Sequence, residues 1–170
     1  GGGELNLPRD VYSDIFLGNV TNWSDPRIAA ANEGTVLPDL PITVVVRSDS
    51  SGTTFNFTNH LSAISEAFNA GPGAGTSVQW PSSDKFVKAP KNDGVTATIM
   101  QTPGAIGYVE YGFAKLTGTA MATLENAAGN ALVAITNDLQ MNHAAGTDIL
   151  NLNGGTLQVT FSDNTTVDAT

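Results

Sequence analysis

The stretch RSDSSGTT, residues 47–54, carries side chains that could bind an anion. Arg47 offers a planar fork of N–H donors that matches the oxygen atoms of a phosphate or a carboxylate. Ser51, Gly52 and Thr53 then stand directly before a segment with helical periodicity. Because the first N–H groups of a helix lack intrahelical acceptors and attract negative charge, this stretch predicts a small oxyanion bound at a helix start.

A supporting role is expected for Asp49, which follows Arg47 by two residues and could fix the orientation of its guanidinium. The alternative is a plain helix cap, because Ser, Thr and Gly are common at helix starts without any ligand. An arginine at the end of a buried strand is seldom unpaired. Either Asp49 alone or an anion as well therefore satisfies Arg47, and the residues leave both alternatives open.

The flanking segments predict the elements that position this stretch. The run ITVVVR before it is apolar on both faces, which is typical of a central strand in a parallel sheet. The segment TTFNFTNHLSAISEAFNAG after it places Phe57, Leu61, Ile64 and Phe68 on one face of a helix. Further alternation of strands and helices predicts an α/β fold with helices packed on a mostly parallel sheet.

The rest of the chain gives weaker signals. Residues 71–92 are rich in Gly, Pro, Ser and Asp and predict a long loop, anchored to the core by Val78 and Trp80. NDGVTATIMQ predicts a short helix and AIGYVEY a strand. From Ala127 onward the chain changes character, with a helix expected around Leu132 to Met141 and a polar strand at TLQVTFS.

Composition and residue types exclude several kinds of function. The formal net charge of -9 leaves no basic face for a nucleic-acid backbone, and the chain contains no cysteine for thiolate catalysis or metal binding. The two histidines, at 60 and 143, have no ligand-like spacing, so we expect no metal and no cofactor. Trp23, Trp80, Tyr108 and Tyr111 are expected as core or loop anchors.

A hydrolase is a further possibility that the residue types raise. Ser51, His60 and Asp49 contain the residue types of a catalytic triad. However, the sequence lacks the Gly-x-Ser-x-Gly elbow, and residues so close along one helix start cannot obviously reach triad geometry. No other nucleophile is apparent, so we expect a binding protein rather than an enzyme.

Four long segments together resemble a known family. DIFLGNVTNWSDPRIAAANEG, LPDLPITVVVRSDSSGTTFNFTNHLS, SVQWP and QTPGAIGYVEYGFAK, in this order, closely resemble the phosphate-binding proteins of bacterial ABC-type phosphate importers. The resemblance covers roughly residues 4–130 and implies one lobe of a type II periplasmic-binding-protein fold. The expected domains are therefore a lobe over residues 1–130 and a divergent tail over 131–170.

The resemblance also implies a ligand and partners. It implies that Arg47, Ser51, Gly52 and Thr53 bind inorganic phosphate, with Asp49 orienting the arginine. It further implies an ABC phosphate permease as partner and a periplasmic or extracellular location.

The matching segments correspond to the second lobe of that family, and the first lobe, which supplies a carboxylate that accepts the phosphate proton, has no counterpart in the sequence. We therefore expect half a binding site, completed by a missing lobe or another domain of a longer chain. The alternative is a secreted adhesion or structural module that reuses this lobe without transport.

Overall fold

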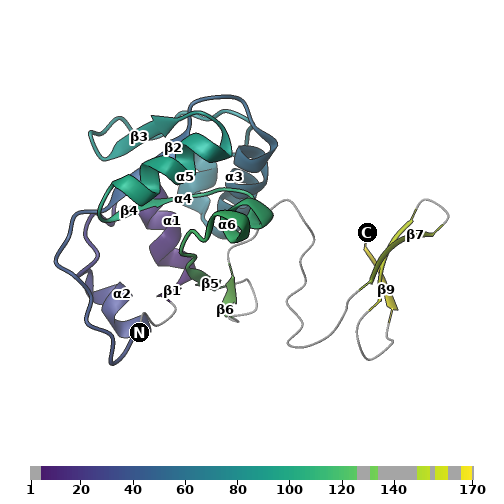
Figure 1. Cartoon of the computed structure of the whole chain (residues 1–170), viewed down its shortest axis with the longest axis horizontal. Helices are drawn as coiled ribbons and strands as arrows, with labels where there is room; N and C mark the ends of the chain where they lie inside the picture. The colour runs from purple at the N-terminus through teal and green to yellow at the C-terminus, as the bar shows by residue number, and fades with distance from the viewer. Residues whose placement is uncertain (1–4, 126–130, 134–148, 154–155, 161–165, 170) are drawn as a thin grey trace. The chain divides into compact units, whose positions relative to one another are not determined.

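The computed structural model describes residues 5–125, 131–133, 149–153, 156–160 and 166–169 (Figure 1). The chain divides into two compact units, Gly1–Asp138 and Leu139–Thr170, which we treat separately. The boundary expected at residue 130 stays a prediction. In the described part of the chain, no helix is both long and apolar enough to cross a membrane.

The first unit contains a parallel sheet at its centre. Strand β2 (Thr43–Arg47) lies between β3 (Phe86–Ala89) and β4 (Ala105–Gly107) and runs parallel to both. A second sheet has the order β1 (Asn6–Leu7), β5 (Thr123–Glu125), β6 (Ala131–Val133), in which β5 is parallel to β1 and antiparallel to β6. The predicted α/β architecture and the central position of residues 43–47 are confirmed.

Helices cover both faces of the β2 sheet, which explains the uninterrupted apolar run. Val44 and Val46 belong to a core shared with α1 (Arg9–Leu17) and α3 (Gly52–Ile64). Val45 points to the opposite face, where it packs with Val95 of α5 (Lys91–Gln101) (Figure 1). Because successive side chains of a strand alternate between faces, a strand between two helical layers needs apolar residues throughout.

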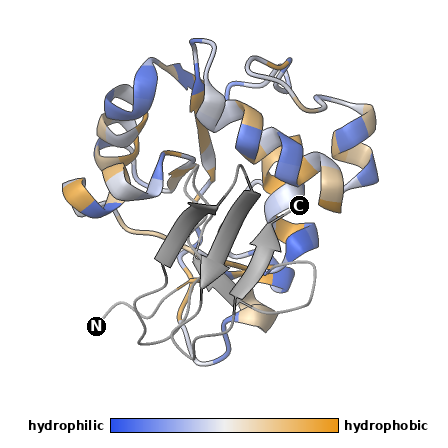
Figure 2. Cartoon of the chain, turned by 90° about the vertical axis from the view of Figure 1, so that its right-hand side faces the viewer, coloured by the Kyte–Doolittle hydropathy of each residue, from blue (hydrophilic) through white to orange (hydrophobic). Residues whose placement is uncertain are grey.

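The remaining helices are short. They are α2 (Pro26–Ala31), α4 (Glu66–Ala70) and α6 (Tyr111–Thr117). Asp25 caps α2 by accepting a hydrogen bond from the N–H of Arg27, and Gly18 ends α1 in the left-handed conformation at φ 77°. Figure 2 shows hydrophilic and hydrophobic residues alternating along the helices, as expected for helices with one buried face.

The continuous helix predicted after residue 52 is wrong at Ser65. This residue is extended, with φ -134° and ψ 111°, and separates α3 from α4. Its hydroxyl oxygen accepts a hydrogen bond from the N–H of Phe68 at 3.2 Å, so Ser65 caps the second helix. The chain changes direction at this cap, yet Phe68 is completely buried. The spacing of apolar residues therefore continues through the break between the two helices.

The long loop predicted over residues 71–92 is also wrong, because it contains β3. This strand is short and lies at the edge of its sheet, and Lys88 within it is exposed. Its pairing with β2 is made between residues about forty positions apart, for example Val87 with Val45. Local composition carries no signal of such a distant partner. Trp80 does pack against the core, as expected.

The second unit is an antiparallel meander. Its strands are β7 (Ile149–Asn153), β8 (Thr156–Thr160) and β9 (Thr166–Ala169), in the order β7, β8, β9. The strand expected at TLQVTFS is confirmed over 156–160. The helix expected around Leu132 to Met141 is wrong at residues 132 and 133, which belong to β6. The rest of that prediction lies outside the described residues.

Candidate anion-binding site

Arg47 lies at the carboxyl end of β2, with only 8% of its side chain exposed. Its Nε donates to Oδ1 of Asp49 at 2.8 Å, and its Nη2 donates to Oδ2 of the same carboxylate at 2.5 Å. This two-point contact holds the plane of the guanidinium in a fixed direction. The pairing of Arg47 with Asp49 expected from the sequence is therefore present.

The start of α5 adds two contacts that the sequence did not predict. Nη1 of Arg47 donates to Oδ1 of Asn92 at 3.2 Å, and the backbone N–H of Lys91 donates to Oδ1 of Asp49 at 2.9 Å. Ala89, the last residue of β3, pairs with Arg47 across the sheet, so the residues that follow it must lie beside the arginine. Had β3 been predicted from the sequence, its pairing with β2 would have placed Lys91 and Asn92 near Arg47.

These contacts set the charges at the site. Hydrogen bonds from Arg47, and then from the N–H of Lys91, hold the pKa of Asp49 well below its ordinary value. The Asp49 hydrogen bonds likewise raise the pKa of Arg47. Both groups are therefore charged at neutral pH. A guanidinium has five N–H donors, and the contacts described use three of them, so donors remain for a ligand.

The start of α3 follows Arg47 closely in the chain, with Ser51 as its N-cap. A helix leaves its first four N–H groups without intrahelical acceptors. The N–H of Ser51 donates to the carbonyl of Thr76 at 2.9 Å, and that of Thr54 donates to Oγ of Ser51 at 3.3 Å. The helix itself supplies no acceptor for the other two N–H groups, those of Gly52 and Thr53. Ser51 can therefore offer a ligand only its hydroxyl hydrogen.

Tyr108 connects the arginine to the start of α3. Its hydroxyl accepts a hydrogen bond from the backbone N–H of Arg47 at 3.3 Å and shares another with Oγ1 of Thr54 at 2.8 Å. Thr54 is 1% exposed, and burial raises the pKa of Tyr108, which is therefore neutral. Tyr108 is a core anchor, as expected from the sequence, but it also positions two parts of the site.

Replacing Tyr108 by phenylalanine tests this positioning role. The change keeps the ring and removes the hydroxyl, which leaves the buried Thr54 hydroxyl and the Arg47 amide without their partner. We expect the free energy of unfolding to fall by about 1–3 kcal/mol. Urea unfolding followed by circular dichroism measures the change, with Tyr111→Phe as control. An unchanged unfolding midpoint for Tyr108→Phe would show that these bonds contribute nothing.

Ser51, His60 and Asp49, which have the residue types of a catalytic triad, each bond to other partners. Asp49 is bonded to Arg47 and Lys91, Oγ of Ser51 accepts from Thr54, and His60 Nε2 bonds to the hydroxyl of Tyr12 at 2.7 Å. The structure does not bring Ser51, His60 and Asp49 together as a triad. Within the described ranges, no cluster of three His, Cys, Asp or Glu residues could hold a metal ion.

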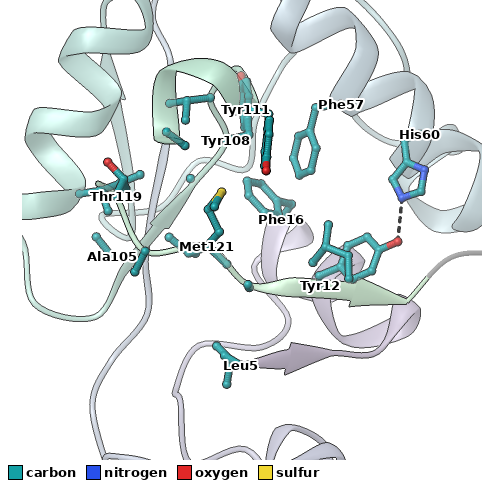
Figure 3. A pocket seen from close by; sticks show the side chains of 18 of the residues that line it. Leu5, Tyr12, Phe16, Phe57, His60, Ala105, Tyr108, Tyr111, Thr119 and Met121 are labelled. Atoms are coloured by element: carbon teal, nitrogen blue, oxygen red, sulfur yellow. Dashed lines mark hydrogen bonds between the residues drawn. The ribbon is translucent and has the colours of Figure 1, made fainter. Parts of the chain in front are cut away.

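A separate cavity of about 330 Å³ lies between α1, α3, β4 and β5 (Figure 3). Phe16, Phe57, Tyr108 and Met121 line it, and the hydrogen-bonded pair of His60 and Tyr12 lies at one end. Burial lowers the pKa of His60, so this histidine is neutral at neutral pH. Because mostly carbon lines the cavity, a phosphate there would lose its hydration without enough donors in return. Of these two places, only the one around Arg47 offers charged donors for an anion.

A sequence model described as the PBP superfamily domain matches residues 2–158. The chain belongs to this superfamily. The resemblance to periplasmic binding proteins seen in the sequence is thereby confirmed, and the site described above is the start of two helices in a PBP superfamily domain.

Several relatives of this PBP superfamily chain carry the name phosphate-binding protein. PstS of Pasteurella multocida is 46% identical over 127 residues, which are 75% of this chain and 36% of the relative. PstS of Methanocaldococcus jannaschii is 42% identical over 129 residues, 74% of this chain and 33% of the relative. PstS3 of Mycobacterium bovis BCG is 41% identical over 145 residues, 85% and 38% respectively. The chain thus spans about a third of the length of these relatives.

Solved structures are also similar to the PBP superfamily chain. A phosphate-binding protein from Stenotrophomonas maltophilia matches 64% of this chain and 32% of its own, with 25% identity and a TM-score of 0.49. PstS from Borrelia burgdorferi matches 81% of this chain and 44% of its own, with 21% identity and a TM-score of 0.48.

Proposed function

We propose that this chain binds inorganic phosphate as one lobe of the solute-binding component of an ABC-type phosphate importer. The observation that carries the proposal is the guanidinium of Arg47, which is only 8% exposed, is held by two contacts with Asp49 and belongs to a residue four positions before the N-cap of α3. Such a group presents its remaining N–H donors in a fixed direction, next to a helix end that favours negative charge. The names of the relatives support phosphate as the anion.

The residues that we propose as ligands are those expected from the sequence. Arg47 supplies the guanidinium donors, Gly52 and Thr53 supply backbone N–H groups, and Ser51 supplies its hydroxyl. Asp49 orients the arginine without touching the anion. The lobe performs no chemistry on phosphate in this proposal, and its place is outside the cytoplasm, where an importer collects its solute.

The site is half of a clamp in this proposal. All of the proposed donors come from one lobe, so the opposite side of a bound phosphate faces water or another domain. Water raises the local dielectric constant and weakens each charge-assisted contact. We therefore expect a dissociation constant of about 1 mM for this chain, which corresponds to about 4 kcal/mol of binding free energy.

Calorimetric titration of the chain with phosphate tests the proposal. We expect saturation in the millimolar range, and sulfate should bind about as well as phosphate. The reason is that Asp49, the carboxylate at the site, already accepts three hydrogen bonds and has little capacity for the phosphate proton. Micromolar affinity would contradict the half-site. Absence of any binding at tens of millimolar would contradict phosphate binding and would favour a secreted adhesion or structural module.

A further inference from the structure

Lys91 has an unusual backbone conformation directly beside the anion site. Its φ is 55°, and in the part of the chain that the structure describes it is the one non-glycine residue with a positive φ. The other residues with positive φ there are glycines, at positions 18, 34, 73, 104 and 118. A side chain with a Cβ atom is disfavoured in this region of the backbone map because of contact with neighbouring backbone atoms.

The backbone around Lys91 explains why this position needs a positive φ. Pro90 follows β3 and packs against Gly94 so closely that a Cβ at Gly94 would lie 2.8 Å from the proline ring. The chain must turn at Lys91 to begin α5 and to direct its N–H at Asp49. None of these contacts involves the side chain of Lys91. Glycine would adopt the same conformation without steric cost, so the fold does not explain the lysine side chain.

The position of Lys91 suggests a role for its charge. Its N–H lies 2.9 Å from the same carboxylate oxygen that accepts from Nε of Arg47, and the next residue, Asn92, bonds to the guanidinium. The side chain is exposed and ends in an ammonium group on a flexible four-carbon stem. It can therefore move toward an anion held at Arg47 without disturbing the braced guanidinium.

The charges around Arg47 favour such a movement of the Lys91 ammonium group. Asp49 pairs with Arg47, and Asp93 lies close enough to contribute to the raised pKa of the arginine, after the larger effects of Asp49 and Tyr108. Without a further cation, the carboxylates of Asp49 and Asp93 outnumber the charge of Arg47. A doubly charged phosphate would then approach a site that is negative on balance.

We propose that Lys91 is a further anion-binding residue, which supplies a second positive charge to the phosphate from the start of α5. This inference rests on the proposed function, because it concerns the same anion. It adds a contact from the β3–α5 connection to those from the β2–α3 connection. The strained backbone at residue 91 is the cost of placing a charged side chain where glycine would fit best.

Phosphate titrations of Lys91 variants test the inference, with the amide signals of Gly52 and Thr53 followed by NMR. Lys91→Gly should unfold at a higher urea concentration than the unmodified chain, because the strain is relieved, yet bind phosphate roughly two- to fivefold more weakly, the range of one exposed ion pair. Lys91→Gln should bind as weakly without the gain in stability. The difference from the unmodified chain should shrink at high salt.

Lys88→Gln is the matched control, because Lys88 is also exposed and lies on β3, three residues earlier. It should leave phosphate affinity unchanged. If Lys91→Gly and Lys91→Gln bind phosphate as the unmodified chain does, or if Lys88→Gln loses as much affinity, the inference is overturned while the proposed function stands. If the unmodified chain binds no phosphate, the proposed function fails and this inference fails with it.

Discussion

Replacing Arg47 by alanine should abolish detectable phosphate binding while leaving the helix content of the lobe nearly unchanged. A hydrogen bond to a charged group contributes about 1.5–3 kcal/mol, so the loss of even one guanidinium contact weakens binding roughly ten- to hundredfold. Starting from a millimolar dissociation constant, this moves binding beyond the measurable range. The fold should tolerate the change because Asp49 is 37% exposed and keeps its bond from the Lys91 N–H.

Arg27→Ala is the control for this experiment. Arg27 also forms ion pairs with two aspartates, Asp14 at 2.7 Å and Asp25 at 3.2 Å, but its side chain is 43% exposed and it is not part of the site. Its removal changes the net charge of the chain by the same amount and should leave phosphate binding intact. Calorimetry and far-UV circular dichroism measure both effects. If Arg47→Ala binds phosphate normally, the arginine does not belong to the site.

Substitutions at Gly52 should separate binding from stability. A Cβ atom at this position meets no protein atom within 4 Å, and its φ is not positive, so alanine fits the folded chain. Because alanine restricts the unfolded chain more than glycine does, Gly52→Ala should keep the free energy of unfolding or raise it by about 0.4–1 kcal/mol. Phosphate binding should weaken nevertheless, since a side chain here hinders the approach of an anion to the backbone.

Gly52→Val should weaken binding more than alanine does, because its side chain is larger. The matched control is Glu66→Val, which places the same side chain at the first residue of α4, away from the site. Affinity is measured by titration with phosphate and stability by urea unfolding. If Gly52→Val lowers only the stability and leaves affinity as it was, the glycine is structural and the anion lies elsewhere.

The part of the site that lies within one local segment could be predicted from the sequence. The apolar run over residues 43–46 predicted a strand with both faces buried, and Arg47 at its end could be recognised as a residue in need of a partner. Asp49, two residues later, was the nearest acid. The start of α3 could be predicted because hydroxyl residues and a glycine precede a segment whose apolar residues have helical spacing. Each of these inferences depends on neighbours within a few positions.

The parts that come from distant segments could not be predicted. Asn92 and Lys91 reach Arg47 only because β3 pairs with β2, and the short, partly polar β3 has no periodicity that marks it as a strand. The hydrogen bond between Tyr108 and Thr54 likewise joins residues from two different strand–helix connections. Such contacts depend on sheet order, which is a property of the whole lobe rather than of any local segment.

A crystal structure of the chain at saturating phosphate tests the central claim most directly. We predict a tetrahedral anion within hydrogen-bonding distance of the guanidinium of Arg47, the N–H groups of Gly52 and Thr53, and the hydroxyl of Ser51. The Asp49 carboxylate should remain paired with the arginine and should not contact the anion. An empty site, with Arg47 bonded only to Asp49 and Asn92, or a phosphate bound elsewhere on the lobe, would contradict the account.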